Sequence, residues 1–361
     1  MITDAVIIGA GPAGTAAGEY IAREGYEVSI LEKCRSPGRN KICGGALSKK
    51  SFNNLGLPKI IIEKECTQFT VHFPEGNLRV PSKPGFILFN RENLDQLLAQ
   101  RAANNGARLM TSTIVSDVTT CNNGLAVHFM SHQSGELGKI RARIVIFADG
   151  TSTIAYKKFK IGFSRRLDET ALAAAYDLSC AENPLNSLDF FFADEISPFG
   201  YGWIFPKKYS VNIGVVCLLS KMQQSIRDHL DYFASLAGFG SLKVIRFGCR
   251  LIPQSCAKMI FGDSVLVVGD AAGTADPIDG GGIFNALVSG EVAGKVAAEA
   301  LESGNTSADF LTKYEELWKN TENYKLLKRS SLIHRLAFKA NVNIGIFLKE
   351  MGFFEQYDRV K

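Results

Sequence analysis

Apolar positions in this chain follow two patterns, and each pattern predicts a different kind of β-sheet. Short, continuous apolar runs at residues 6–8, 140–147 and 264–269 are typical of strands that are buried on both faces. Between residues 171 and 249 the apolar residues instead form short alternating runs that are rich in aromatic side chains. This region predicts a second, antiparallel sheet. Its strands are expected at residues 172–178, 187–192, 202–205, 210–218 and 242–247.

Helical periodicity and turn residues define the remaining elements. The predicted helices cover residues 91–105, 225–237 and 283–301, and residues 308–361 are expected to be helical as well. Further strands are expected at residues 67–73 and 86–89, with turn residues between them that include Pro84 and Gly85. Residues 109–118 and 125–129 predict a hairpin-like pair around Asn122, Asn123 and Gly124.

A glycine-rich turn follows the first apolar run. Gly9, Gly11 and Gly14 fit the pattern G-x-G-x-x-G, which permits a tight turn and lets backbone approach a pyrophosphate. Pro12 suits the first turn of the helix that follows, because its missing N–H would have no partner there. Glu32 ends the next strand about 20 residues later, where an acidic side chain accepts hydrogen bonds from a ribose. These elements in register predict dinucleotide binding.

Composition excludes several classes of protein. The chain has 361 residues, 46% hydrophobic and 21% charged, as in ordinary globular proteins, and a net charge of +5 that does not imply nucleic acid. Its 8 cysteines are scattered without CxxC or Cys/His pairs, which argues against a metal site, an iron–sulfur cluster or a disulfide framework. No apolar run reaches the roughly 18 residues of a membrane-spanning helix. No signal peptide is visible, so we expect a cytoplasmic protein.

The turn formed by Cys43, Gly44 and Gly45 is a second candidate for ligand contact. Two adjacent glycines let backbone N–H groups approach a flat ligand, although the same residues would also suit a flexible turn. Arg39 and Lys41 lie just before Cys43, and this electropositive neighbourhood favours the thiolate form of a cysteine. Cys43 is therefore a candidate for chemistry, with an inert thiol as the alternative.

Three other segments are candidates for ligand contact. Arg91 stands in the first turn of a predicted helix, where a cation interacts unfavourably with the helix dipole. A nearby phosphate would explain a cation at this position, and a solvated arginine is the alternative. Asp149 and Gly150 form a turn after a buried strand. The glycines at residues 280–282 leave the N-terminus of the helix 283–301 open, with its partial positive charge facing outward.

Three blocks together resemble one family. The N-terminal glycine turn and the Gly269-Asp270-Ala-Ala-Gly273 turn are similar to those of FAD-dependent oxidoreductases of the para-hydroxybenzoate hydroxylase superfamily. Residues 198–206 resemble the P-x-x-Y-x-W-x-F-P signature of geranylgeranyl reductases, and residues 41–45 and 276–283 resemble further motifs of that family. The motifs are closest to those of digeranylgeranylglycerophospholipid reductases. The resemblance covers roughly residues 1–320, and the C-terminal tail matches nothing distinctive.

The resemblance implies bound FAD and a set of residues that contact it. Glu32 would hold the adenosine ribose, Asp270 the ribityl chain and Arg91 the pyrophosphate, while the backbone of Val115 would lie by the adenine. The expected FAD-binding residues are Gly9, Gly11, Ala13, Gly14, Glu32, Lys33, Gly44, Gly45, Leu47, Arg91, Val115, Asp149, Asp270, Gly281, Gly282 and Ile283.

The expected fold is mixed α/β, with a Rossmann-type FAD-binding domain, an interleaved antiparallel-sheet substrate domain and a helical C-terminus. The FAD-binding domain would comprise residues 1–65, 90–165 and 260–305. The substrate domain would comprise residues 66–89 and 166–259, and the C-terminal helical region residues 306–361.

The resemblance implies reduction of double bonds in a prenyl (geranylgeranyl-type) chain on a lipid, a quinone or a chlorophyll precursor. Tyr201, Trp203 and Phe205 alternate, so they share one strand face, where aromatic rings could stabilise a developing cation. The alternative for these rings is ordinary sheet core. Tyr201, Trp203, Phe205 and Pro206 are the expected substrate contacts, and Cys43, Tyr201 and Trp203 the expected catalytic residues. The proton donor is left open between Tyr201, Cys43 and water.

The tail at residues 325–349 contains six Lys and Arg and no Asp or Glu, with apolar residues between them. This pattern fits a helix on an anionic membrane surface, and equally a capping helix with a solvated basic face. The expected location is therefore the cytoplasm, with peripheral membrane contact as one reading. Nucleic acid is not an expected partner.

Three questions stay open at this level. An aromatic hydroxylase or a flavin halogenase would share the first and last motifs, although Tyr201 and Phe205 depart from the W-x-W-x-I-P pattern of halogenases. A non-catalytic, flavin-bound regulator is a further alternative. The external reductant could be NADPH or ferredoxin, because only one dinucleotide-binding fingerprint is present.

Overall fold

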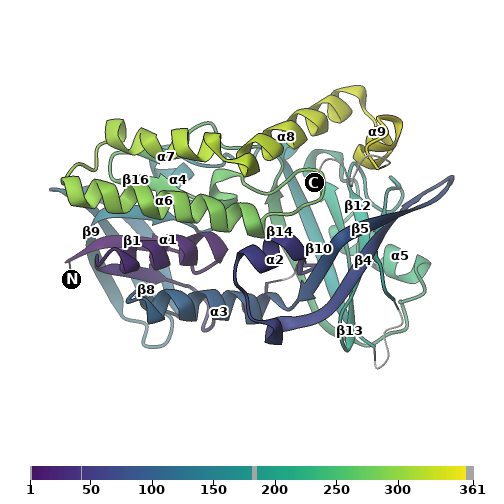
Figure 1. Cartoon of the computed structure of the whole chain (residues 1–361), viewed down its shortest axis with the longest axis horizontal. Helices are drawn as coiled ribbons and strands as arrows, with labels where there is room; N and C mark the ends of the chain where they lie inside the picture. Colours follow the sequence, from purple (N-terminus) through teal and green to yellow (C-terminus); the bar gives the residue numbers. More distant parts are fainter. Residues whose placement is uncertain (1, 42, 181–184, 355–361) are drawn as a thin grey trace. The chain divides into compact units, whose positions relative to one another are not determined.

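The computed structural model of the chain describes residues 2–41, 43–180 and 185–354 (Figure 1). It divides into two compact units, each built from three separate segments of the chain. Unit 1 comprises Met1–Arg39, Glu92–Arg165 and Pro253–Ser331, and unit 2 comprises Asn40–Arg91, Arg166–Ile252 and Leu332–Lys361. Residues 40–65, which the sequence analysis assigned to the FAD-binding domain, thus belong to unit 2.

Unit 1 is organised around a mixed sheet in the order β15-β16-β9-β1-β2-β6, to which β8 and β7 add through β9. The pairs of β1 with β2 and β9, of β2 with β6 and of β9 with β16 are parallel. Its strands are β1 Ile2–Ile8, β2 Val28–Leu31, β6 Arg108–Met110, β7 Thr113–Cys121, β8 Gly124–Ser131, β9 Leu137–Phe147, β15 Phe261–Gly262 and β16 Val265–Val267. Ile7, Ile146 and Leu266 are fully buried, as the continuous apolar runs predict.

Helices complete unit 1. They are α1 Pro12–Arg23, α3 Arg91–Asn104, α4 Ile154–Phe159, α6 Ile283–Ser303, α7 Ala308–Asn320 and the short 3-10 turn η4 Gly269–Ala272. Figure 1 shows α6 lying alongside α1. The two helices touch backbone to backbone, because a Cβ on Gly290 would come 2.1 Å from the carbonyl oxygen of Ala13. Tyr314 of α7 ties this layer to the sheet by donating to the carbonyl of Val267 at 3.0 Å.

Unit 2 contains one sheet in the order β14-β10-β13-β12-β11-β4-β5-β3. Its strands are β3 Ala46–Ser48, β4 Ile62–Phe73, β5 Gly76–Phe89, β10 Thr170–Ser179, β11 Leu188–Phe191, β12 Tyr201–Pro206, β13 Ser210–Leu218 and β14 Val244–Pro253. The helices are α2 Lys49–Asn54, α5 Ile226–Leu236, α8 Glu322–Ala340, which begins in unit 1, and α9 Ile344–Glu350, with 3-10 turns η1 Lys59–Ile61, η2 Leu167–Glu169 and η3 Leu219–Lys221.

The two faces of the unit 2 sheet differ because side chains alternate along each strand. One face forms an apolar core with α5, in which Leu230 and Phe233 pack against Ile204, Ile213 and Val215. The opposite face carries the neighbouring residues of the same strands, including the aromatic side chains of β12. A capping box at Ser225 and Asp228 fixes the start of α5.

Two predicted elements differ from the observed ones. The single strand expected at residues 109–118 is two strands, because Ser112 takes a left-handed backbone (φ +52°) and the chain turns out of the parallel sheet after β6. Pro84 and Gly85 do not end a strand but lie within β5. The register between β4 and β5 shifts there, from Cys66 opposite Phe86 to Gln68 opposite Pro81, so the proline sits in a bulge. Residues 355–361 of the predicted helical tail lie outside the described residues.

Candidate cofactor and substrate sites

The glycine turn of unit 1 connects β1 to α1 and leaves room for a ligand. Gly9 has φ +106°, and a Cβ on it would lie 2.5 Å from the carbonyl oxygen of Ala148. A Cβ on Gly14 would lie 2.0 Å from the carbonyl oxygen of Gly9. At Gly11, in contrast, a Cβ would meet nothing within 4 Å. The turn is therefore closed toward the protein and open at the glycine that would face a pyrophosphate.

Glu32 lies beside this turn at the end of β2. Its carboxylate is buried and accepts hydrogen bonds from the backbone N–H groups of Ala10 and Cys34, both at 2.9 Å. Each carboxylate oxygen keeps a further lone pair that can accept from a hydroxyl group. Lys33, the next residue, is exposed, and Val115 is half-buried in β7. The position of Glu32 suits the ribose contact that the resemblance implies.

Asp149 provides a test of whether this region fits a cofactor. Its Oδ2 accepts from the backbone N–H of Ile154 at 2.7 Å, whereas its buried Oδ1 has no hydrogen-bond partner among the described residues. Burial raises the pKa of this carboxyl, against the opposing effect of the Ile154 hydrogen bond. A buried polar atom without a partner is unfavourable in isolation. A polar group of a bound cofactor would satisfy it.

The N-terminus of α6 forms another polar wall within unit 1. The helix begins at Ile283, and its N-cap residue Gly282 has no side chain to satisfy the first N–H groups. Gly282 lies close to Asp270, because a Cβ there would be 3.4 Å from Asp270 Oδ1. Uncapped N–H groups and a helix dipole are suited to anionic or carbonyl acceptors. With the glycine turn, Glu32 and Asp149, these residues fit FAD.

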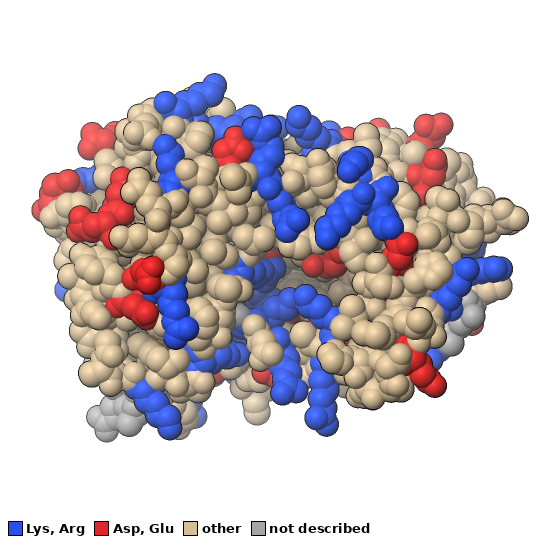
Figure 2. All heavy atoms as spheres, turned by 180° about the vertical axis from the view of Figure 1, so that it is seen from behind, with Lys and Arg blue, Asp and Glu red and all other residues tan. Residues whose placement is uncertain are grey.

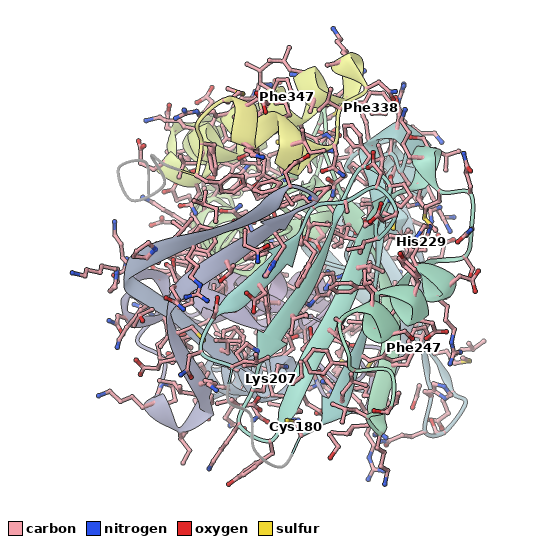
Figure 3. All side chains as sticks on the ribbon, turned by 90° about the vertical axis from the view of Figure 1, so that its right-hand side faces the viewer. Cys180, Lys207, His229, Phe247, Phe338 and Phe347 are labelled. Atoms are coloured by element: carbon pink, nitrogen blue, oxygen red, sulfur yellow. The ribbon has the colours of Figure 1, made fainter. Side chains whose placement is uncertain are left out.

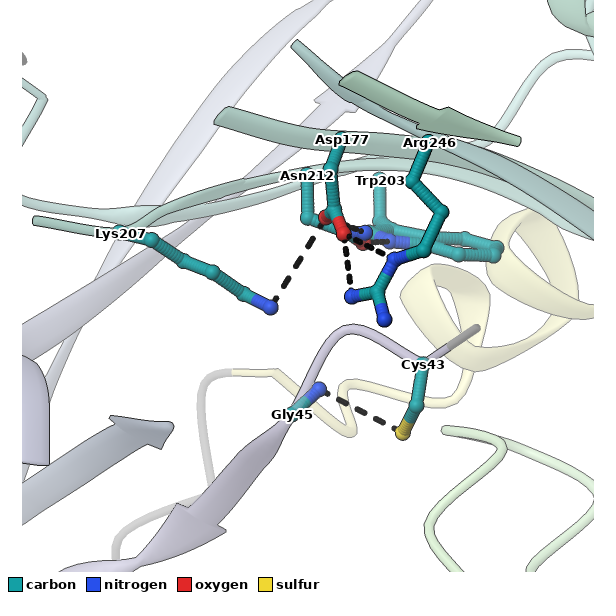
Figure 4. Close-up of polar contacts among 7 residues, drawn as sticks. All are labelled: Cys43, Gly45, Asp177, Trp203, Lys207, Asn212 and Arg246. Atoms are coloured by element: carbon teal, nitrogen blue, oxygen red, sulfur yellow. Dashed lines mark hydrogen bonds and ion pairs between the residues drawn. The ribbon is translucent and has the colours of Figure 1, made fainter. Parts of the chain in front are cut away.

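The Cys43 loop belongs to unit 2 and is held tightly (Figure 4). The backbone N–H of Gly45 donates to Cys43 Sγ at 3.4 Å, and the carbonyl of Gly45 accepts from the N–H of Phe89 at 2.8 Å. Gly44 lies against the ring of Phe205, where a Cβ would come within 2.4 Å of a ring carbon. The loop therefore packs directly on the aromatic face of the sheet. Leu47 in β3 is buried as well.

Tyr201, Trp203 and Phe205 lie on one face of β12. Neighbouring ring centroids are 6.2 Å apart for Tyr201 and Trp203 and 6.4 Å apart for Trp203 and Phe205. Phe190 joins them, with its ring 5.3 Å from Phe205, whereas Phe191 points to the opposite face and packs on Phe233. Pro206 ends the strand. Tyr201, Trp203 and Phe205 are themselves buried, and together with Phe190 they form a continuous row of rings, which we call the aromatic face.

A buried charged cluster beside the aromatic face was missed by sequence reasoning. Asp177 accepts a hydrogen bond from Arg246 Nε at 2.9 Å, and its other oxygen lies 3.9 Å from the ammonium of buried Lys207 (Figure 4). Lys207 is also labelled in Figure 3, beside the unit 2 sheet. Burial alone would raise the pKa of Asp177, but Lys207, Asn212 and Arg246 together hold it below its usual range. Asp177, Asn212 and Arg246 come from three different strands and Lys207 from the turn after β12, so no local motif connects them. The only signal was an acidic residue inside the apolar run of β10.

The predicted site residues fall into two sets, one in each unit. Unit 1 carries the glycine turn, Lys33, Glu32, Val115, Asp149, Asp270, Gly281, Gly282 and Ile283, and unit 2 carries Cys43, Gly44, Gly45, Leu47, buried Arg91, Tyr201, Trp203, Phe205 and Pro206. Among the described residues, no group of three or more His, Cys, Asp or Glu could hold a metal ion.

Two family models match the chain. The family described as FAD binding domain matches residues 2–187, and the family described as geranylgeranyl reductase catalytic domain matches residues 170–248. Digeranylgeranylglycerophospholipid reductase 2 of Methanothermobacter thermautotrophicus is 33% identical over 88% of this chain and 83% of its own length. The digeranylgeranylglycerophospholipid reductase of Methanococcus aeolicus is 30% identical over 90% of this chain and 83% of its own length.

Solved structures place the fold in the same group. A geranylgeranyl bacteriochlorophyll reductase-like protein from Thermoplasma acidophilum superposes with a TM-score of 0.86 at 26% identity, covering 96% of this chain and 90% of its own. The flavin-dependent brominase Bmp2 has a TM-score of 0.75 at 18% identity over 100% of both chains, which reflects a shared fold alone. From the matched domains and the relatives that span most of its length, the chain belongs to the geranylgeranyl reductase family of FAD-dependent oxidoreductases.

Proposed function

We propose that this protein is an FAD-dependent reductase that saturates carbon–carbon double bonds of a prenyl chain carried by a lipid. The observation that carries the proposal is the aromatic face of β12, which packs against the Cys43 loop. The strand β12 lies within residues 170–248, which match a geranylgeranyl reductase catalytic domain. Relatives named digeranylgeranylglycerophospholipid reductase favour a phospholipid over a quinone or a chlorophyll precursor. NADPH or ferredoxin would serve as the external reductant.

Reduced FAD supplies a hydride when it is bound. Within unit 1, Glu32 would hold the adenosine ribose, Asp270 the ribityl chain, and the open N-terminus of α6 a negatively charged ring edge. Arg91, Gly44, Gly45 and Leu47 of unit 2 are proposed as further contacts of the cofactor.

The chain's own residues would act on the alkene. An isolated trisubstituted double bond is not an electrophile, so it accepts hydride only as one of its carbons gains a proton and the other becomes cationic. Aromatic faces stabilise a cation by ~0.5–2 kcal/mol each. Tyr201, Trp203 and Phe205 would supply these faces. Tyr201, Cys43 and water remain the candidate proton donors.

Anaerobic turnover tests the proposed reaction. With reduced FAD and a geranylgeranylated phospholipid, the product should gain two hydrogens for each reduced bond, measured by mass spectrometry. An aromatic monooxygenase would instead consume oxygen with NADPH and an aromatic acid. Oxygen-dependent substrate oxidation without any anaerobic mass gain would contradict the reductase assignment, and flavin that no substrate reoxidises would indicate a non-catalytic protein.

Replacing rings of the aromatic face should impair turnover more than flavin content. Trp203→Ala is expected to lower kcat by about tenfold, and Tyr201→Phe by less, because each ring contributes about one cation–π interaction. Bound FAD per chain, read from absorbance, should stay near the wild-type value. Phe191→Ala on the opposite face of the sheet is the matched control. Equal losses in all three variants would make the rings purely structural.

Cys43→Ala should keep FAD bound and lower reductase turnover at saturating reductant, because the thiol that receives the Gly45 N–H is removed from the loop. Cys66→Ala is the control within unit 2. Burial raises the pKa of the Cys66 thiol to about 11, so that residue stays protonated and inert at neutral pH. Unchanged turnover of Cys43→Ala would remove this residue from the mechanism.

The α8 helix is proposed to contact a membrane surface. Its exposed side combines Leu326, Leu332 and Leu336, which are 42%, 51% and 46% exposed, with the cations Lys325, Lys328, Arg329, Arg335 and Lys339. His334 faces inward, where burial lowers its pKa to about 4, so it adds no charge at neutral pH. Three exposed leucines among five cations on one side of a helix are the pattern of helices that lie on anionic membranes. Figure 2 shows one face of the molecule, on which Lys and Arg are spread with Asp and Glu among them. Among the described helices, none is long and apolar enough to cross a bilayer.

Vesicle co-sedimentation of the full chain checks this proposal. Binding to vesicles of phosphatidylglycerol should exceed binding to phosphatidylcholine and should weaken in high salt, because the attraction is largely electrostatic. The double variant Leu332→Gln with Leu336→Gln should lose most of the binding. Leu236→Gln, at an exposed leucine of α5, is the control and should bind as the wild type does. Absence of wild-type binding to both vesicles would rule out attachment through α8.

A further inference from the structure

A chain of polar side chains crosses four adjacent strands of the unit 2 sheet. Trp203 of β12 donates its indole N–H to Asn212 Oδ1 of β13 at 2.7 Å. Asn212 donates its amide Nδ2 to Asp177 Oδ1 of β10, also at 2.7 Å, and Arg246 of β14 closes the chain on Asp177 Oδ2 (Figure 4). Asp177 and Asn212 are direct cross-strand partners, so the sheet register itself sets this contact. The indole is thereby connected to a carboxylate.

The chemistry of its two ends fixes the direction of this chain. An indole N–H is only a donor, and an ionised carboxylate is only an acceptor. The Asn212 amide therefore has one satisfactory orientation, with its oxygen toward Trp203 and its nitrogen toward Asp177. A neutral partner in place of Asp177 would allow the amide to flip and would leave the indole N–H facing another donor.

Two further contacts keep the chain in place. Lys207 is 2% exposed and lies 3.9 Å from Asp177 Oδ1, so the carboxylate has a cation on each side. Gly214 lies under the indole, because a Cβ there would come 2.1 Å from a carbon of the six-membered ring. Gly214 thus sets where the ring lies, while Asn212 sets how it is turned.

Burying these charges costs solvation free energy, and the stability of the fold alone does not require buried charges here. Ions removed from water lose several kcal/mol of solvation, and apolar residues of similar volume often serve a core as well. What a carboxylate provides instead is polarisation, since hydrogen bonds to an ion are stronger and successive bonds reinforce one another. A polarised indole N–H leaves more electron density in the ring, and the face of such a ring attracts a cation more strongly.

We propose that Asp177 is a positioning residue of the reductase, which acts through Asn212 to orient Trp203 and to strengthen the ring's interaction with positive charge developing on the prenyl alkene. The inference rests on the proposed function. It assigns Asp177, Asn212, Lys207 and Arg246 a role in the transition state rather than in flavin binding.

The isosteric variant Asp177→Asn tests the connection directly. In protein labelled with 15N-tryptophan, the indole N–H resonance of Trp203, assigned with Trp203→Phe, should move upfield. The resonance of Trp318, buried in α7 of unit 1, should stay in place as an internal control. Turnover should fall by about threefold to tenfold in kcat with an unchanged KM and FAD content, as expected for an interaction made in the transition state.

A double-mutant cycle separates positioning from a structural role. If Asp177 acts through the indole N–H, adding Asp177→Asn to Trp203→Phe should lower kcat little further, because phenylalanine has no N–H to polarise. Independent, multiplying losses would overturn the inference. So would an unmoved Trp203 resonance in Asp177→Asn.

Arg246→Gln provides a second route if Asp177→Asn does not fold. It removes one cation from the partly exposed end of the chain and leaves Asp177 ionised beside Lys207. The carboxylate then polarises Asn212 more strongly, so the Trp203 resonance should move downfield, opposite to its shift in Asp177→Asn, whereas Arg250→Gln on the same strand should leave it in place. The spectrum reports on the hydrogen-bond network without any turnover. The proposed reductase function and the proposed role of Asp177 can therefore be contradicted independently. A wild type that reduces no prenyl bond overturns the proposed function and the catalytic role with it, and an active wild type with an insensitive resonance overturns this inference alone.

Discussion

Both units depend on close contacts that are possible only because a glycine, with no side chain, stands at the point of contact. In unit 1 a Cβ at Gly14 or Gly290 would lie only 2.0 or 2.1 Å from a carbonyl oxygen, too close for any non-bonded contact, so α1 packs against the glycine turn and α6 only through glycine. In unit 2 the rings of Trp203 and Phe205 occupy the space where side chains of Gly214 and Gly44 would be. The same steric rule thus shapes a turn that fits a cofactor and the packing of the row of aromatic rings.

Because side chains alternate along each strand, the two faces of the unit 2 sheet carry different kinds of residues. The face toward α5 is a conventional apolar core, and it holds the sheet together. The opposite face can therefore carry features that weaken a core, namely a row of rings and a buried ionic cluster. Asp177 and Tyr176 illustrate the division, because adjacent residues on one strand serve the ionic cluster and the α5 core respectively.

Local sequence was sufficient where structure depends on local contacts. The helix at residues 283–301, the strand at 210–218 and the glycine turn appear close to their predicted bounds, since each follows from periodicity or from a contiguous motif. The FAD-binding family and the reductase family are also confirmed by the matched domains. Ser112 was missed because a left-handed residue that ends β6 has no composition signal. The Asp177 cluster was missed because sheet register joins residues 35 and 69 positions apart. The roles predicted for individual site residues stay predictions.

The interleaving of the two units has a consequence for biosynthesis. β1 has β9 as a neighbour only after residue 147 has been made, and α1 has α6 as a neighbour only after residue 303. A nascent chain therefore carries the buried side of α1, with Ala13, Ala17 and Ile21, uncovered through most of translation. The layer that holds the glycine turn is therefore completed only when α6 packs on α1, and an unfinished layer of this kind exposes apolar surface that favours aggregation.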